Sequence, residues 1–128
     1  MLKDNFFTIE ERTETDKGWE YRIALNASHP IYQAHFPKNP VTPGVCIIQI
    51  IKEIAEDYCS TSFFIRSLKN VKFLQVLNPF DTREAIIKLT CQANETGNYS
   101  VSAVISKDQL VFSKLTLHLV EINKGGNG

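Results

Sequence analysis

An apolar stretch near the middle of the chain, VCIIQIIKEIAEDY, places the strongest limit on the fold. Its apolar residues recur at helical spacing and cover well over half of a helix circumference. The pattern predicts a helix that begins near Pro43–Gly44 and ends at about Tyr58. The remaining face is one polar stripe, formed by Gln49, Lys52, Glu53 and Glu56. Because only that stripe is polar, other elements have to cover most of the helix, Val45 included.

The segments around this helix are typical of strands. Turn signals separate the strand-like stretches, which are residues 5–15, 18–26, 67–77, 84–94, 99–106 and 110–122. The last three follow one another through short connections, so they predict an antiparallel meander. One buried helix with five or six antiparallel strands predicts an α+β domain in which the sheet curls around the helix.

Charge and cysteine content narrow the function classes. Fourteen basic and fourteen acidic side chains give a net charge of zero, which argues against broad binding to nucleic acid or to a membrane surface. Three cysteines without CxxC spacing, and no apolar signal segment, indicate a cytoplasmic protein with free thiols. The scattered His and Cys residues predict no metal site. No apolar run is long enough for a membrane span.

A proline-rich stretch, HFPKNPVTPGV (35–45), precedes the predicted helix and ends a long connector that starts at Ala27. Proline restricts its own backbone and that of the preceding residue, so the stretch is either a stiff connector or a device that positions His35. His35 itself is either a loop histidine bonded to backbone or a general base. Gly44 either meets a steric need of the turn or presents first-turn N–H groups to an oxyanion.

The same stretch resembles the signature of hot-dog-fold β-hydroxyacyl-acyl-carrier-protein dehydratases, His-Phe-Pro-Gly-x-Pro-x-x-Pro-Gly-Val followed by an apolar helix. The segment SHPIYQAHFP resembles the lead-in to the family's histidine, and VKFLQVLNPFD resembles a strand that usually ends in Pro-Gly-Asp. The resemblance covers most of the chain. It implies a single hot-dog domain over residues 1–122. The remaining residues, 123–128, contain no large apolar side chain to pack and are expected to form a disordered tail.

The resemblance also implies a reaction and an assembly. His35 matches the histidine that removes the α-proton of a β-hydroxyacyl thioester, and Gly44, with Val45 beside it, matches the site that binds the thioester carbonyl. Each site in the family takes its acidic residue from the helix of a second subunit. The implied substrate is an acyl carrier protein or coenzyme A thioester, carried on phosphopantetheine without a further cofactor. The chain is therefore expected to form a homodimer or a larger assembly.

The chain departs from the family pattern at the acidic position, which holds Gln49. An amide can hydrogen-bond to a departing hydroxyl but has no accessible proton to give. Glu53, one turn further along the stripe, either substitutes for the acid or is an ordinary solvated helix residue. Four aromatic residues either line an acyl tunnel or belong to the core: Tyr32, Phe36, Phe73 and Phe112.

These observations give one leading hypothesis and two alternatives. The leading hypothesis is a 3-hydroxyacyl-acyl-carrier-protein dehydratase in fatty-acid or polyketide-like synthesis, with His35 as base and Gln49 positioning the β-hydroxyl. The first alternative is a non-catalytic acyl-thioester-binding subunit that pairs with an active homologue. The second is an acyl thioesterase that uses Glu53 or a water activated by His35.

Overall fold

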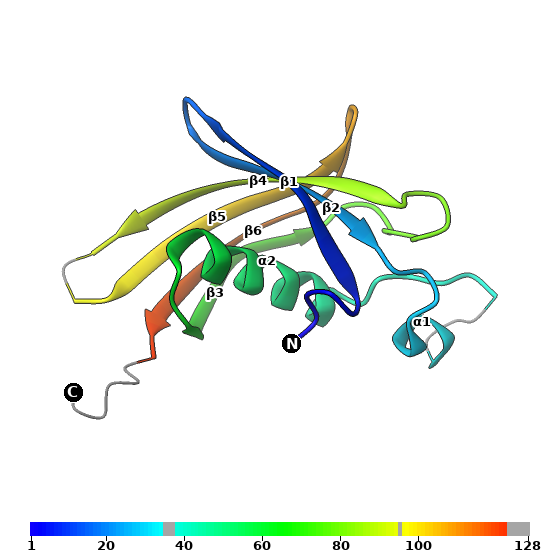
Figure 1. Ribbon diagram of the computed structural model, residues 1–128, viewed down its shortest axis with the longest axis horizontal. Coiled ribbons are helices and arrows are strands. Elements are labelled where there is room, and N and C mark those ends of the chain that lie inside the picture. The colour runs from blue at the N-terminus through cyan, green and yellow to red at the C-terminus, as the bar shows by residue number, and fades with distance from the viewer. Residues whose placement is uncertain (35–37, 95, 123–128) are drawn as a thin grey trace.

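Six antiparallel strands form one sheet that curls around a single long helix (Figure 1). The computed structural model describes residues 1–34, 38–94 and 96–122. In chain order the elements are β1 (Phe7–Thr15), β2 (Gly18–Leu25), α1 (Pro30–Ala34), α2 (Gly44–Cys59), β3 (Phe63–Phe73), β4 (Glu84–Ala93), β5 (Asn98–Lys107) and β6 (Leu110–Glu121). The strand order across the sheet is β1-β2-β4-β5-β6-β3. The predicted α+β class, the central helix and the β4–β5–β6 meander are confirmed.

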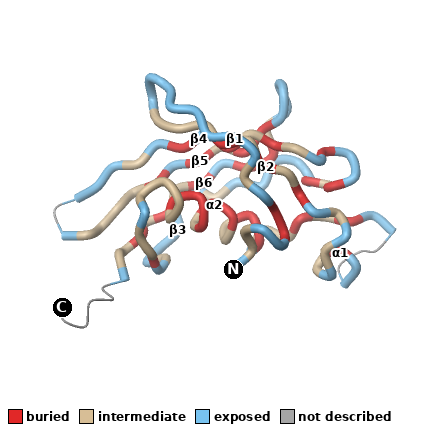
Figure 2. Tube along the Cα trace, in the orientation of Figure 1, coloured by how far each residue is buried: buried red, intermediate tan, exposed pale blue. Residues whose placement is uncertain are grey.

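The core lies between α2 and the inner face of the sheet, where the buried residues gather in Figure 2. Ile50 and Ile54 of α2 are fully buried, and so are Ile87 of β4 and Leu117 of β6. Along each strand of the meander the intervening residues face the other way and are mostly polar, with Ile86 and Val104 among the exceptions. This period of two gives the sheet an apolar inner face and a polar outer face.

The connector before α2 contains the short helix α1. Two expectations need correction. The third strand runs from Phe63 to Phe73 and not over 67–77, because residue 60 ends α2 in the left-handed region and the chain enters the ladder at once. The backbone N–H of Leu74 then bonds to the carbonyl of Phe112, outside the ladder. Val45 is 73% exposed, because it lies on the side of the first helical turn that the sheet does not cover.

The two edge strands differ in character. The β1 edge carries four exposed charged residues, Glu10, Glu11, Arg12 and Glu14, which oppose pairing with another strand. The β3 edge instead exposes large apolar side chains, Phe64 and Leu68. Of the two edges, β3 is therefore the one suited to pair with a second chain. Within the described ranges, no helix has the length and apolar character needed to cross a membrane.

Candidate functional site

The N-terminus of α2 presents open backbone donors. Pro43 is the extended residue before the helix and supplies no side-chain cap. Its carbonyl accepts the N–H of Cys46 at 2.9 Å and that of Ile47 at 3.1 Å. Among the described residues, the N–H groups of Gly44 and Val45 have no acceptor. Two open donors and the positive end of the helix dipole therefore meet at one place, which suits a carbonyl oxygen that gains negative charge.

A groove of about 300 Å³ opens beside these donors, between the start of α2 and residues 73–77. The Phe73 ring packs directly on Gly44, and a Cβ at that position would lie only 2.8 Å from the Phe73 Cζ atom. Gly44 is thus required sterically by the approach of Phe73. This requirement is compatible with a binding role, because Gly44 itself lines the groove.

The rim of this groove is apolar and unusually exposed. Of the lining residues, Phe73 is 51% exposed, Leu74 48% and Val76 59%, and Val45, which follows the lining residue Gly44, is 73% exposed. A cluster of exposed apolar side chains around a groove marks a surface that binds an apolar ligand or another chain. The groove therefore combines apolar walls with a pair of polar donors at one end.

Tyr32 is held inside the protein and not on the groove wall. Its hydroxyl lies 2.8 Å from the hydroxyl of Thr42, and both side chains are buried. Its ring stacks on that of Phe6 at 4.9 Å. Burial raises the pKa of Tyr32 to about 12, so the phenol stays neutral. Tyr32 thus links α1 to Thr42, just before α2. In the sequence, these two residues flank the stretch that carries His35 and Phe36.

His35 and Phe36 lie outside the described residues. Phe112 is 2% exposed and belongs to the core. Cys46 is also buried, and this burial raises the pKa of its thiol, which disfavours a nucleophilic role. Within the described part of the chain, no group of three or more His, Cys, Asp or Glu residues could hold a metal ion.

Glu53 is not a solvated helix residue, so that interpretation is wrong. It is 2% exposed, and the N-terminal segment covers it. Its two carboxylate oxygens accept the backbone N–H of Leu2 and of Lys3, each at 2.7 Å. The Gln49 side-chain amide donates to the same carboxylate, also at 2.7 Å. Pairing with three donors offsets the cost of burying a carboxylate.

These contacts define what Gln49 and Glu53 can do. An ionised carboxylate only accepts hydrogen bonds, so the Gln49 amide has to turn its nitrogen toward Glu53. Among the described residues, the carbonyl oxygen Oε1 and the second N–H of Gln49 have no partner. Glu53, with three donors on its oxygens, is a structural anchor for the N-terminus and for Gln49. Sequence reasoning missed this anchor, because backbone donors fifty residues away leave no mark in the helix pattern.

A curled antiparallel sheet around one long helix, with a groove at the N-terminus of that helix, defines the hot-dog class of proteins. A chain of a dehydratase heterocomplex named ApeI:P, from Xenorhabdus doucetiae, has this fold with a TM-score of 0.68. The alignment covers 88% of this chain and 96% of that one at 19% identity, so the likeness is one of fold.

Sequence comparison then gives the family. Residues 10–114 match the ApeI-like dehydratases, and the chain belongs to that family. Two curated relatives are both named 3-hydroxyacyl-[acyl-carrier-protein] dehydratase FabZ. The protein from Lactiplantibacillus plantarum is 27% identical over 101 residues, which span 73% of this chain and 67% of the relative. The protein from Wolbachia pipientis wMel is 26% identical over 128 residues, spanning 93% and 88%.

Proposed function

We propose that this chain binds 3-hydroxyacyl thioesters at the N-terminus of α2 and takes part in their dehydration. The observation that carries the proposal is the pair of open N–H groups at Gly44 and Val45, at the end of an apolar groove that Gly44 lines, in a chain of the dehydratase family. A thioester carbonyl placed there would receive hydrogen bonds as its oxygen gains charge during α-proton removal. His35 is the proposed base for that proton, which leaves the α-carbon before the β-hydroxyl departs.

The proposed site is shared by two chains. The exposed β3 edge and the exposed rim at Val45, Phe73 and Val76 both call for cover by another subunit. Gln49 lies five residues after Gly44 on α2, about 7.5 Å along the helix axis. We place it at the site of the partner subunit, where its amide would hold the β-hydroxyl.

A second candidate function, a binding subunit without its own acid, is favoured by the contacts of Gln49. Its amide nitrogen donates a hydrogen bond to Glu53. The Glu53 carboxylate is buried and accepts three hydrogen bonds in all. On this arrangement, neither side chain offers a proton to a departing hydroxyl. Such a chain would contribute the oxyanion site and histidine while an active homologue supplies the acid. The solved chain from Xenorhabdus doucetiae comes from a dehydratase heterocomplex, which supports testing for a partner of this kind.

The test is to incubate the purified chain with 3-hydroxyacyl thioesters of acyl carrier protein and of coenzyme A, alone and with an active FabZ-type homologue. Mass spectrometry separates loss of water from thioester hydrolysis and from no reaction. His35→Ala should abolish dehydration, whereas His118→Ala, on β6 and bonded to Ser67, should leave it unchanged. Activity only with the homologue would favour the binding-subunit role. Full activity in His35→Ala would refute the assignment of the base.

A further inference from the structure

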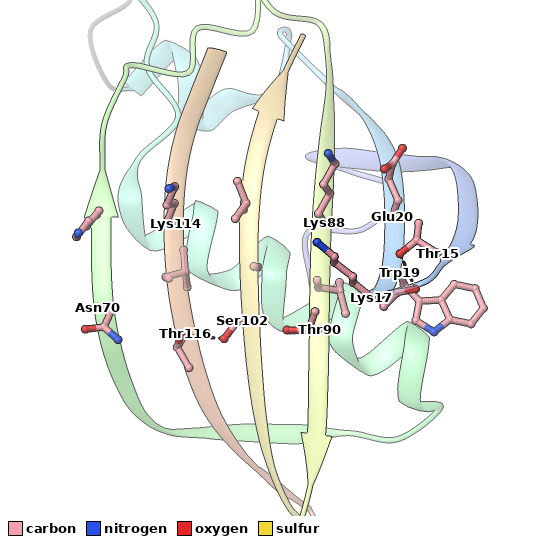
Figure 3. Close-up of a pocket in the computed structure, with 16 residues that line it drawn as sticks. Thr15, Lys17, Trp19, Glu20, Asn70, Lys88, Thr90, Ser102, Lys114 and Thr116 are labelled. Carbon is pink, nitrogen blue, oxygen red and sulfur yellow. Dashed lines mark hydrogen bonds between the residues drawn. The ribbon is translucent and has the colours of Figure 1, made fainter. Parts of the chain in front are cut away.

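The outer face of the sheet, opposite α2, holds a second groove of about 440 Å³ (Figure 3). Four exposed lysines line it: Lys17, Lys72, Lys88 and Lys114. We call it the lysine groove. Among its described lining residues the acidic one is Glu20, so the groove has a local formal charge of +3 in a chain whose net charge is zero.

Strand register sets three of these lysines in one row. Lys88 of β4 and Lys114 of β6 both pair with Val104 of β5, which lies between them. Lys114 in turn pairs with Lys72 of the edge strand β3. Three strand spacings separate the ends of the row, so it spans about 14 Å. Like charges placed directly opposite one another in a sheet destabilise it, yet Lys72 and Lys114 stand in that arrangement.

Within the described part of the chain, internal ion pairs do not neutralise the charges of these lysines. Four ion pairs occur among the described residues, and none of them uses a lysine of this groove. A β-bulge between Lys69 and Lys72, with Asn70 in the left-handed region, interrupts the β3 ladder just before Lys72. Bulges redirect side chains and are common beside binding sites.

The floor between the lysines mixes polar and apolar groups. Thr90, Ser102 and Thr116 form the next row across β4, β5 and β6, and the Ser102 and Thr116 hydroxyls lie 3.1 Å apart. Figure 3 shows these three side chains beside the lysines, on the face away from the helix. Val104 and the aliphatic stems of the lysines add apolar area between the charges. An apolar centre with a charged rim is typical of a protein interface.

The geometry points to an acidic helix of a partner protein as the occupant of the lysine groove. A row of charges about 14 Å long is wider than one phosphate or carboxylate group. Carboxylates at positions i, i+4 and i+7 of a helix lie on one face within about 10.5 Å, which fits a helix laid along the row. Among the described lining residues there is no arginine, and the Trp19 ring contacts Tyr58 of α2. The described lining therefore lacks the arginine and free aromatic side chains with which proteins bind single-stranded nucleic acid.

The test uses a synthetic helical peptide with glutamates at i, i+4 and i+7, and the same peptide with glutamines as its control. Titration into the ¹⁵N-labelled protein at about 50 mM NaCl should shift the amide signals of Thr90, Ser102, Val104 and Thr116, and about 0.5 M NaCl should remove the effect. The glutamine peptide should cause no such shifts. If inorganic pyrophosphate or a short single-stranded oligonucleotide bound this groove more tightly than the acidic peptide, the proposal would be overturned.

Matched charge reversals distinguish peptide binding at the lysine groove from a general effect of net charge. An exposed ion pair contributes up to about fivefold in affinity, so losing two such pairs in Lys88→Glu/Lys114→Glu should weaken peptide binding by up to about 25-fold. Lys107→Glu/Arg83→Glu makes the same change in net charge at exposed positions outside the groove and should weaken it less than about twofold. Equal losses in the two variants would overturn the proposal.

A single variant shows whether the lysine row serves peptide binding or the stability of the fold. Lys114→Glu replaces a repulsive cross-strand pair with an attractive one to Lys72, so it should raise the urea midpoint. The same change should weaken peptide binding by up to about fivefold, because it removes the central charge of the row. A more stable Lys114→Glu protein that keeps its full affinity for the peptide would overturn the docking role of this row.

Discussion

Replacing Gln49 by Glu tests the contact that distinguishes this chain from its relatives. The two side chains have nearly the same shape, so a carboxyl at position 49 would meet the Glu53 carboxylate where the amide nitrogen now lies, 2.7 Å from Oε2. Two carboxylates about 4 Å apart at an effective dielectric of about 20 repel by about 4 kcal/mol. The backbone N–H groups of Leu2 and Lys3 also donate to the Glu53 carboxylate and leave no room for it to move away. The new carboxyl should therefore hold its proton, with a pKa well above that of an ordinary glutamate.

The consequence for stability depends on pH, with a sign set by the raised pKa. Below about pH 4.3, the introduced carboxyl is protonated in both folded and unfolded chains, so the Gln49→Glu variant should be as stable as wild type. Above that pH the carboxyl ionises in the unfolded chain and stays protonated in the folded chain. The variant should then lose about 1.4 kcal/mol per pH unit, up to the limit of about 4 kcal/mol set by the repulsion.

Urea unfolding at four pH values, from about 4.5 to about 8.5, measures this loss. Gln49→Ala is the control, because it removes the same hydrogen bond without adding a charge, and its loss of stability should not depend on pH. Gln49→Glu/Glu53→Gln removes the repulsion and should abolish the pH dependence. A Gln49→Glu variant whose stability relative to wild type stays constant over this range would show that the two side chains are not in contact.

The same variant carries a prediction for activity. The introduced carboxyl, protonated near neutral pH, is a proton donor at the position where the family has its acid, so dehydration should increase by about 10²-fold if only the acid is missing. Formation of the conjugated enoyl thioester, followed by absorbance at about pH 6, measures the gain. If wild type and Gln49→Glu are equally inactive alone but active with a homologue, the chain is a binding subunit whose acid comes from its partner.

Three further predictions concern stability and can share one urea-unfolding assay. Gly44→Ala should cost about 1–3 kcal/mol, because its Cβ would overlap the Phe73 ring, and Gly44→Ala/Phe73→Ala should recover most of that loss. Ser113→Ala should add about 1 kcal/mol, because the buried Ser113 hydroxyl has no hydrogen-bond partner among the described residues, and a loss would reveal a partner. Ile54→Ala should cost about 2–5 kcal/mol, against less than about 0.5 kcal/mol for the exposed Val45→Ala.

The helix and the meander could be predicted from the sequence because their signals are local. Helical spacing predicted α2 to within a residue at each end, and alternation predicted the three strands of the meander. The pattern failed at Val45, which is exposed although its neighbours Cys46 and Ile47 in the same turn are buried. Periodicity reports which side of a helix is apolar and not how wide the covered side is in each turn.

The surroundings of Glu53 and of the lysines could not be predicted because they depend on long-range contacts. Backbone N–H groups of Leu2 and Lys3 convert Glu53 from an apparent surface charge into a buried anchor, and almost any residue type at those two positions would supply the same donors. Lys72 and Lys114 are far apart in the chain and become neighbours only through the register of β3 with β6. Strand pattern alone does not fix that register, since the bulge before Lys72 shifts it.

Strand β3 connects the two surfaces that carry the proposals. Phe73 faces α2 and closes over Gly44, whereas Lys72, one residue earlier, faces the outer groove, because successive residues of a strand point to opposite sides. The edge of the same strand exposes Phe64 and Leu68. A second chain that paired along this edge would cover the apolar side chains and bring its own Lys72 to the same outer surface. The acyl site and the lysine groove would then both depend on one assembly contact, while the ligands on the two faces remain separated by the thickness of the sheet.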